Sequence, residues 1–465
     1  MNTSSQFLFL SLIVIWYISV SGANTTIHPE EKKALESIAK SLGKKDWNFD
    51  IDPCSNKPKW FTNAANKVAC NCSVAGDNFC HVVEISLKDQ NLLGTLPTEL
   101  NRLRYLQIID LTRNYLGGTI LKEWGGSMMN INKISLIGNQ LTGSIPVEIA
   151  NITTLQDLQL WNNQLSGILS LELGYLTQIR RLQISSNNFT GELPATLAKL
   201  TTLIDFKISD NQFSGKIPDF IQNWSNISEL MIQGSGLSGP IPSGISLLKN
   251  LTELIISDLN GSEYAPLPQL NNMTLLKTLV LRNCNINGTL TQYLGIMSKL
   301  KHLDLSFNSI SGTIPSIYAT NNSLFLSGNL LTGLVPSWKP KVNEDLSYNN
   351  FNIRQGSQIC HHEKVNLFST SWAHNYIGTV SCLRKCRKPS YSLYINCGGK
   401  QETVNERTYD DDSDSSGPTK FHHSPTGNWA FITTGIFIDH GQLGEIYSPQ
   451  NITTLTMNDA ELYMN

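Results

Sequence analysis

Apolar residues recur along most of this chain in a fixed order, with a period of about 24 residues. Each period has apolar residues at positions one, four and six, Asn at position nine and an L-x-G-x-I/L-P segment after it, as in Ile131–Pro146. Alternation at positions three to six predicts a short strand with one buried and one open face. The periods begin at Val82, Leu106, Ile131, Leu155, Ile179, Leu203, Ile227, Leu251, Leu276 and Leu300, and a shortened coil (Asn321–Pro336) and a half-coil ending near Asn349–Phe351 follow.

A fixed repeat of this length predicts a leucine-rich repeat solenoid over residues 82–352, with a parallel sheet on its concave side. The L-x-G-x-I/L-P segment resembles the plant-type repeat, which implies a second short sheet on the convex side. The Asn at position nine is expected to bond the backbone of the neighbouring coil, because an unpaired buried amide or carbonyl is costly. The Asn series is interrupted at Gln90, Ser235, Leu259 and Cys284.

Two of these interruptions lead to local predictions. Leu259 has no polar group for the backbone bonds, and the run Glu263–Pro268 is inserted after it. The coil from Leu251 to Leu275 is therefore expected to be irregular. Cys284 is small enough to replace Asn in the buried position, so it is expected to be a free, unreactive thiol.

Composition and charge fit a solenoid followed by one further domain. The chain has 465 residues, of which 15% are charged and 8% aromatic. Its formal net charge is −2, so it has no electrostatic signature for binding nucleic acid or an anionic membrane.

The N-terminus indicates secretion. Phe7–Val20 is an apolar run of the length of a secretory signal, and Ser21–Gly22–Ala23 supplies small residues for cleavage, so residues 1–23 are expected to be a signal peptide. No later apolar run approaches the roughly 18–20 residues of a membrane helix, and the mature chain is expected to be soluble and extracellular or at the cell surface.

Many Asn-x-Ser/Thr triplets agree with an extracellular glycoprotein. The candidate glycosylation sites are Asn24, Asn71, Asn151, Asn188, Asn223, Asn226, Asn250, Asn260, Asn272, Asn287, Asn321 and Asn451.

Eight cysteines flank the repeats in two groups and predict disulfide-stapled caps, because a solenoid exposes its core at both ends. The N-terminal cap spans 24–81, where residues 30–42 have the spacing of an amphipathic helix, and the C-terminal cap and linker span 353–389. Zinc is the weaker alternative, because C-x-C has no second matching pair. The pairing stays open among Cys54, Cys70, Cys72 and Cys80, and the later candidates are Cys360, Cys382, Cys386 and Cys397.

Catalytic signatures are absent from the sequence. Gly234–Gly239 reads as GxGxxG, but it falls on the turn of a repeat, without the helix and acidic residue that a nucleotide site needs. No kinase motif or hydrolase triad is present. The chain is expected to be no enzyme and to need no cofactor or metal.

Beyond Pro389 the repeat stops, and the chain resembles the extracellular part of a plant leucine-rich-repeat receptor-like serine/threonine kinase with a malectin domain. The resemblance covers essentially the whole mature chain and rests on Asp52–Cys54 with Cys70–Cys72, Ile256–Gly261, Leu281–Cys284 and Tyr394–Gly399. It implies that residues 390–465 begin a β-sandwich malectin-like domain, which is less than half of a complete one. The family's membrane helix and kinase domain are absent from this sequence, so kinase activity is not carried over to it.

Several outward positions are candidates for a ligand surface. Position five is apolar in three successive coils, at Met231, Ile255 and Val280, beside the acidic Asp205, Glu229 and Glu253. Trp161 at position seven is expected to lie next to Arg180 and Arg181. The alternative is that the apolar residues only stack on one another. In the malectin-like piece, the candidates for stacking on sugar rings are Tyr409, Phe421 and Trp429.

Three functions remain open. The first is a recognition module of a receptor kinase that binds a peptide, a protein, a cell-wall glycan or a co-receptor ectodomain. The second is a secreted inhibitor of wall-degrading enzymes, similar to polygalacturonase-inhibiting solenoids, although the Tyr394–Gly399 run argues against it. The third is a secreted decoy that binds ligand without signalling.

Overall fold

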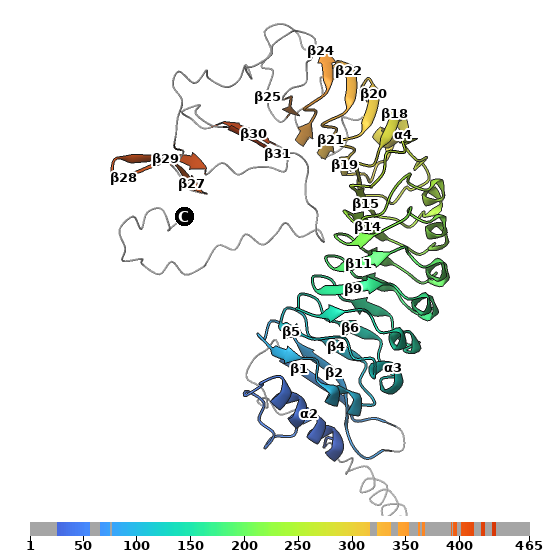
Figure 1. The fold of residues 1–465 in the computed structure, drawn as a ribbon, viewed down its shortest axis with the longest axis vertical. Coiled ribbons are helices and arrows are strands. Elements are labelled where there is room, and N and C mark those ends of the chain that lie inside the picture. The colour runs from blue at the N-terminus through green and yellow to red at the C-terminus, as the bar shows by residue number, and fades with distance from the viewer. Residues whose placement is uncertain are drawn as a thin grey trace, which may run out of the picture. The chain divides into compact units, whose positions relative to one another are not determined.

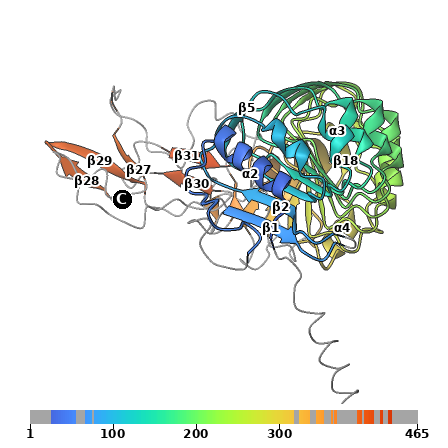
Figure 2. The same cartoon turned by 90° about the horizontal axis from the view of Figure 1, so that it is seen from below.

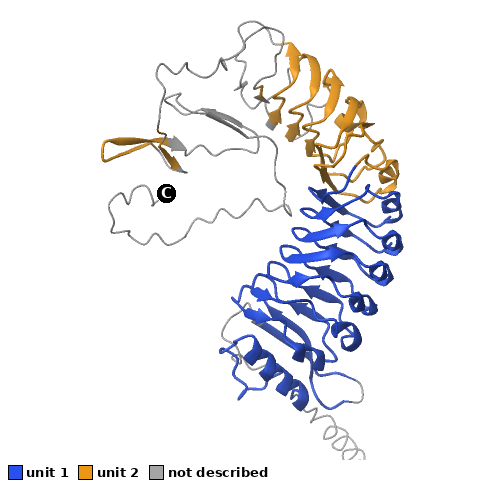
Figure 3. Ribbon diagram, viewed as in Figure 1, with its two compact units in different colours: residues 1–238 blue, residues 239–465 orange. Residues whose placement is uncertain are grey.

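The computed structural model describes residues 26–55, 66–74, 77–316, 323–335 and 343–352, and short segments beyond them (361–362, 365–367, 392, 394–397, 401–412, 420–423 and 430–433). The predicted signal peptide, Cys360, Cys382 and Cys386 lie outside the described residues. The chain divides into two compact units, residues 1–238 and 239–465 (Figure 3).

In the first unit, the repeat forms the predicted parallel sheet (Figure 1). Each strand pairs in register with the equivalent residues of the next coil, so Lys133 lies opposite Asp157 and Asp157 opposite Arg181. An antiparallel strand, β1 (Asn66–Asn71), adds the edge next to β2. The other strands are β2 (His81–Leu87), β4 (Ile108–Asp110), β6 (Lys133–Ser135), β8 (Asp157–Gln159), β10 (Arg181–Gln183), β12 (Asp205–Lys207) and β14 (Glu229–Gln233).

The predicted second sheet is also present on the other side of this unit. Its strands are β3 (Leu93–Thr95) with β5 (Tyr115–Gly117), and β7 (Thr142–Gly143), β9 (Gln164–Ile168), β11 (Asn188–Gly191) and β13 (Gln212–Phe213). Short helices complete the coils: η1 (Thr98–Arg102), α3 (Trp124–Ser127), η2 (Val147–Asn151), η3 (Leu171–Tyr175), η4 (Ala195–Lys199) and η5 (Asp219–Asn223).

The second unit repeats the pattern. Its main sheet contains β15 (Glu253–Ser257), β17 (Thr278–Arg282), β19 (His302–Asp304), β21 (Ser323–Phe325), β23 (Asn343–Asp345), β26 (Val365–Asn366) and β25 (His361–His362). Its second sheet contains β16 (Ala265–Pro266), β18 (Ile286–Thr289), β20 (Ser309–Gly312), β22 (Leu330–Leu334) and β24 (Asn350–Asn352). Two short helices are η6 (Ser243–Leu247) and α4 (Gln292–Ile296).

The Asn ladder bonds the coils as predicted. Nδ2 of Asn139 donates to the carbonyl of Leu111 in the preceding coil at 3.0 Å, and Oδ1 accepts from the amide of Leu116 at 3.1 Å. Cys284 takes the same place with its thiol, which donates to the carbonyl of Ile256 at 3.3 Å. Cys284 is buried and free, as predicted, and burial raises the pKa of its thiol well above the ordinary value.

The coil from Leu251 to Leu275 is irregular, as predicted from Leu259. Strand β15 is regular, but no short helix follows β16, whereas each of the other coils between residues 82 and 300 contains one. Leu259 itself is buried, and its amide donates to the carbonyl of Asn283 at 3.1 Å. With an apolar side chain at position nine, this coil therefore keeps its strand but lacks the short helix that the other coils have after it.

The N-terminal cap consists of α2 (Pro29–Ser41) and β1, which lie beside β2 (Figures 1 and 2). Disulfides join Cys54 to Cys70 and Cys72 to Cys80, which confirms oxidation among these four residues and selects one of the three pairings. Helix α2 begins at Pro29, where the side chain of His28 accepts a hydrogen bond from the amide of Glu30 at 3.2 Å.

A buried ion-paired group that the sequence analysis missed joins α2 to β2. Glu31 accepts from the amide of Val82 at 2.7 Å and contacts Nδ1 of His81 at 2.8 Å. Nε2 of His81 contacts Asp77 at 2.9 Å. Burial lowers the pKa of His81, but the hydrogen bonds to Glu31 and Asp77 outweigh it, so the pKa is raised. The position of Glu31, three and four residues before Ala34 and Leu35, places it on the buried face of the helix.

The C-terminal segments form small sheets. Strand β27 (Ile395–Cys397) pairs with β29 (Arg407–Asp412), which also pairs with β28 (Glu402–Val404). Strand β30 (Lys420–His423) pairs with β31 (Ala430–Thr433). Strand β27 therefore lies within the Tyr394–Gly399 run.

Candidate ligand surface

The outer face of the main sheet in the first unit carries the side chains at positions three, five and seven of each coil. We call this surface the strand face. Polar and charged groups dominate it from β2 to β12, and most of them contact one another across adjacent strands. On this face, most of the polar side chains are therefore held in place by contacts with their neighbours.

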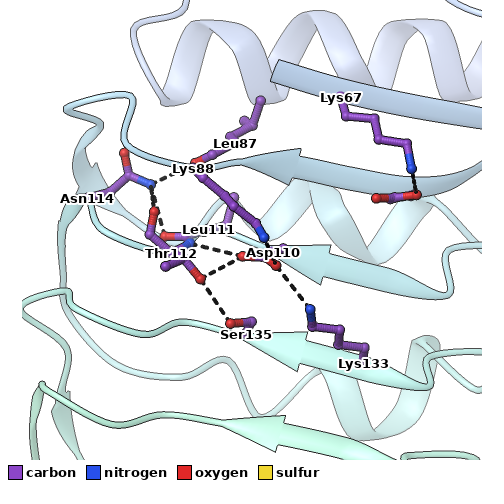
Figure 4. A network of polar contacts seen from close by, with 10 residues as sticks. Lys67, Leu87, Lys88, Asp110, Leu111, Thr112, Asn114, Lys133 and Ser135 are labelled. Carbon is purple, nitrogen blue, oxygen red and sulfur yellow. Dashed lines mark hydrogen bonds and ion pairs between the residues drawn. The ribbon is translucent and has the colours of Figure 1, made fainter. Parts of the chain in front are cut away.

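One centre of this network is Asp110, whose side chain is only 4% exposed. Its Oδ2 lies 3.0 Å from Nζ of Lys88 and 3.2 Å from Nζ of Lys133, which belong to the coils on either side (Figure 4). Its Oδ1 accepts from the hydroxyl of Thr112 at 2.6 Å, and Thr112 contacts Ser135 at 2.9 Å. Burial raises the pKa of Asp110, but hydrogen bonds and the two lysine charges outweigh it and lower the pKa.

A second chain of contacts runs across β8 to β14. Both carboxylate oxygens of Asp157 accept from Arg181 at 3.3 Å. Further along, the ammonium of Lys207 lies 2.6 Å from Glu229 and 3.5 Å from Asp205. Burial and the nearby Glu229 raise the pKa of Asp205 above its ordinary value, although Lys207 opposes them.

The predicted exposed apolar stripe is wrong. Met231, Ile255 and Val280 are 4%, 1% and 6% exposed. Ile255 and Val280 lie opposite one another on β15 and β17, where side chains on strands about 4.8 Å apart cover each other, as in the alternative interpretation. The acidic neighbours also differ from the expectation, because Asp205 is buried while Glu229 and Glu253 are partly exposed.

The strand register differs from the expectation that Trp161 lies next to Arg180 and Arg181. Strands β8 and β10 pair Asp157 with Arg181, so Trp161 lies four residues further along, roughly 13 Å at the rise of a strand. Arg181 instead pairs with Asp157, and Arg180 is exposed. Residues at positions two and seven of neighbouring coils are at opposite ends of the strands.

In the second unit, the equivalent face contains buried acids that the sequence analysis did not single out. Asp304 is 4% exposed and Asp345 is fully buried. Oδ1 of Asp345 accepts from the amide of Ser347 at 3.0 Å and from its hydroxyl at 2.6 Å. Burial raises the pKa of Asp345 to about 6, with the hydrogen bonds opposing it. Burial also raises the pKa of Asp304.

The raised pKa of Asp345 predicts a pH dependence. A group with a raised folded pKa contributes stability that is complete below its unfolded pKa, 3.8, and is lost as the pH rises through about 6. Between pH 4 and pH 7 the loss from this group is at most about 3 kcal/mol. Asp345→Asn is expected to remove this loss of stability between pH 4 and pH 7, as measured by urea denaturation followed by circular dichroism. The control Asp89→Asn, at an exposed carboxylate, is expected to keep the wild-type slope, and an equal slope in Asp345→Asn contradicts the assignment.

Of the three sugar-stacking candidates, Tyr409 has a side chain that the structure describes. Tyr409 lies in β29 and packs against Tyr394, with ring centroids 5.5 Å apart. Phe421 lies in β30, and Trp429 falls outside the described residues.

The GxGxxG run is a turn of the solenoid. Gly234 and Gly236 have positive φ, and a Cβ on Gly236 would clash with the carbonyl oxygen of Phe213. The glycine is thus required by the close approach of two coils. Within the described residues, no group of three or more His, Cys, Asp or Glu side chains is placed to hold a metal ion, and no helix has the length and apolarity to span a membrane.

The sequence of this chain matches known leucine-rich repeat families. A model described as "Leucine-rich repeat region" matches residues 77–257, and "Leucine Rich Repeat" matches residues 299–320. A probable leucine-rich repeat receptor-like serine/threonine-protein kinase of Arabidopsis thaliana is 47% identical over 462 residues, covering 94% of this chain and 44% of the relative. A second such kinase from this plant is 40% identical over 458 residues, covering 94% and 45%. The chain spans less than half the length of these relatives.

Solved structures resemble the repeats. The structure of PEPR1–AtPEP1 is 28% identical, with a TM-score of 0.57, covering 69% of this chain and 48% of that chain. The Arabidopsis receptor kinase HAESA, in complex with the peptide hormone IDA and the co-receptor SERK1, is 26% identical with a TM-score of 0.59, covering 73% and 61%. The chain is therefore a leucine-rich repeat solenoid that is similar in sequence to plant leucine-rich repeat receptor-like kinases and in fold to the receptor kinase HAESA.

Proposed function

We propose that this chain is the extracellular recognition region of a plant receptor-like kinase and that it binds a peptide along the strand face. The observation that carries the proposal is the joint similarity to receptor-like kinases in sequence and to HAESA, solved with a peptide hormone, in structure. A co-receptor ectodomain is a second partner on the same grounds.

The chemistry of the strand face supports this proposal. An extended peptide presents backbone donors and acceptors and alternating side chains, and it needs partners that are already in place, because ordering flexible side chains opposes binding. Asp157 with Arg181, and Asp110 with its two lysines, supply such partners. Their exposed edges remain accessible, because the side chain of Arg181 is 46% exposed and that of Lys88 is also 46% exposed.

The candidate glycosylation sites also support the choice of face. All nine sequon asparagines in the described residues are exposed. Asn71 lies in β1 of the cap, and the other eight follow the strand segment of their coils, outside positions three to seven: Asn151, Asn188, Asn223, Asn226, Asn250, Asn260, Asn272 and Asn287. Glycans at these positions would cover the other sides of the coils and leave the strand face open to a ligand.

The segment from residue 390 onwards is proposed as the start of a malectin-like domain. The proposal rests on the Tyr394–Gly399 run and on strand β27 within it. Tyr394 packs on Tyr409 and lies 5.6 Å from the guanidinium of Arg407, so these rings hold the small sheet together.

Peptide capture tests the proposed function. The secreted protein is incubated with peptide pools from plant extracellular fluid, and the retained peptides are identified and titrated. Arg181→Glu is expected to weaken binding of the retained peptide about tenfold or more, because it reverses a charge on the strand face. The same substitution is expected to change the stability of the protein by no more than about 1 kcal/mol, because the ion pair is exposed. Lys122→Glu makes the same charge change outside the strand face and is expected to bind normally. Equal binding by both variants contradicts the choice of face.

A further inference from the structure

Among the ion pairs on the described strand face of the first unit, the group around Asp110 has more cations than carboxylates. Lys67 pairs with Glu84 at 2.6 Å, and Arg181 pairs with Asp157, so each of these is one cation on one carboxylate. At Asp110, two ammonium groups share a single carboxylate oxygen (Figure 4). The group of Lys88, Asp110 and Lys133 therefore carries one positive charge in excess.

We infer that Lys88 and Lys133 form a subsite for an acidic group of the ligand, a carboxylate or a sulfate or phosphate ester. This inference rests on the proposed function for the identity of the ligand as a peptide. The two Nζ atoms are about 6 Å apart at most, because each lies within 3.2 Å of the same oxygen, so one anion can contact both.

The carboxylate of Asp110 does not occupy the position proposed for the anionic group of the ligand. Oδ2 of Asp110 is shared by both lysines, and Oδ1 accepts from the amide of Thr112 at 3.3 Å and from its hydroxyl at 2.6 Å. Asp110 is buried beneath the lysines, whereas the side chains of Lys88 and Lys133 are 46% and 28% exposed. Each ammonium has three N–H donors, so after contacting Asp110 it keeps donors for a group above the face.

The buried carboxylate has a positioning role in this arrangement. It draws in two long side chains from strands on either side of β4 and so lowers the cost of ordering them when an anion binds. Its lowered pKa keeps it ionised at neutral and mildly acidic pH, so the two lysines remain drawn together there. One lysine would be enough to neutralise Asp110, and the second provides the charge for a ligand.

Sulfate is the first probe, used on the secreted chain. We expect sulfate to raise the melting temperature of the wild type more than chloride at the same ionic strength, because a bound anion stabilises the folded state. Lys88→Gln and Lys133→Gln each leave Asp110 with one cation, so each is expected to fold and to bind sulfate at least about fivefold more weakly. Lys67→Gln removes the same charge from the balanced pair with Glu84 and is expected to respond as the wild type does.

The result that overturns the inference is an equal sulfate response in the wild type, Lys88→Gln and Lys133→Gln. Equal weakening in Lys67→Gln also overturns it, because the effect would then be that of overall charge. The melting temperature in chloride reports folding of each variant. If one variant unfolds, the other still decides the question, since each lysine is changed separately.

A peptide array identifies the source of the anion. Extended peptides of one sequence carry Asp, Glu, phosphoserine, sulfotyrosine or Asn at one central position. The wild type is expected to retain acidic peptides at least about fivefold better than the Asn peptide, and Lys88→Gln is expected to lose that preference. Retention without acidic preference overturns the inference. If no peptide is retained while the sulfate response persists, the anion site stands and the proposed peptide-binding function fails.

Discussion

Replacing Ile255 with Asp is expected to prevent the second unit from folding stably. Ile255 is 1% exposed in β15, so the new carboxylate would be buried without a partner, at a cost of several kcal/mol. Asp304 occupies the same position two coils later, but there the amide of Ser306 donates to the carboxylate at 2.8 Å. The expected readouts are a strong loss of secreted protein and a lower urea midpoint of the protein that is recovered.

The matched control is Ile296→Asp. Ile296 is 63% exposed at the end of α4, so the same chemical change leaves the carboxylate in water and is expected to alter stability by less than about 0.5 kcal/mol. If Ile255→Asp is secreted and as stable as the wild type, the burial of Ile255 in β15 described above is wrong. Position five would then be open to ligand in this coil.

Removing the carboxylate of Glu31 is expected to have the second large effect. Glu31→Ala leaves the amide of Val82 and Nδ1 of His81 without their acceptor in a buried site, which costs about 3–5 kcal/mol. The loss is expected to appear first at the N-terminal cap, as rapid hydrogen exchange in α2 and β2. Glu30→Ala is the control, because its pair with Lys33 is largely exposed.

The penalty for Glu31→Ala is also expected to depend on pH. The pKa of His81 is raised, so its ion pairs contribute stability that is complete below the ordinary value of 6.5 and is lost as the pH rises through the folded value. The penalty is therefore expected to be larger at about pH 5.5 than at about pH 8.5. A penalty that is equal at both pH values would mean that His81 is neutral in the folded protein.

The sequence was sufficient to predict the repeats because their causes are local and recur. Each Asn at position nine meets the same backbone groups, so Asn139 in one coil predicts the contacts of Asn187 two coils later. The exceptions were predictable for the same reason. Leu259 lacks the polar group and Cys284 keeps a weak donor, and the structure shows an irregular coil at the first and a thiol hydrogen bond at the second.

The surface was predicted poorly because exposure depends on neighbouring coils. Ile255 faces away from the core, as the pattern indicates, but it is only 1% exposed and lies opposite Val280 of β17. Trp161 and Arg181 belong to neighbouring coils, but the strand register sets Trp161 four residues beyond Asp157, the partner of Arg181. The two lysines on Asp110 are 45 residues apart in the sequence, at positions seven and three of their coils, and no pattern within one repeat brings them together.

The central claim is that a peptide ligand binds the strand face, and a hydrogen-exchange footprint tests it most directly. The secreted protein is compared with and without a peptide obtained by capture, and protection is measured along the chain. The account predicts slowed exchange in strands β4 to β12 and little change in helices η2 to η5. Protection confined to those helices or to the second sheet, at saturating peptide, would contradict it.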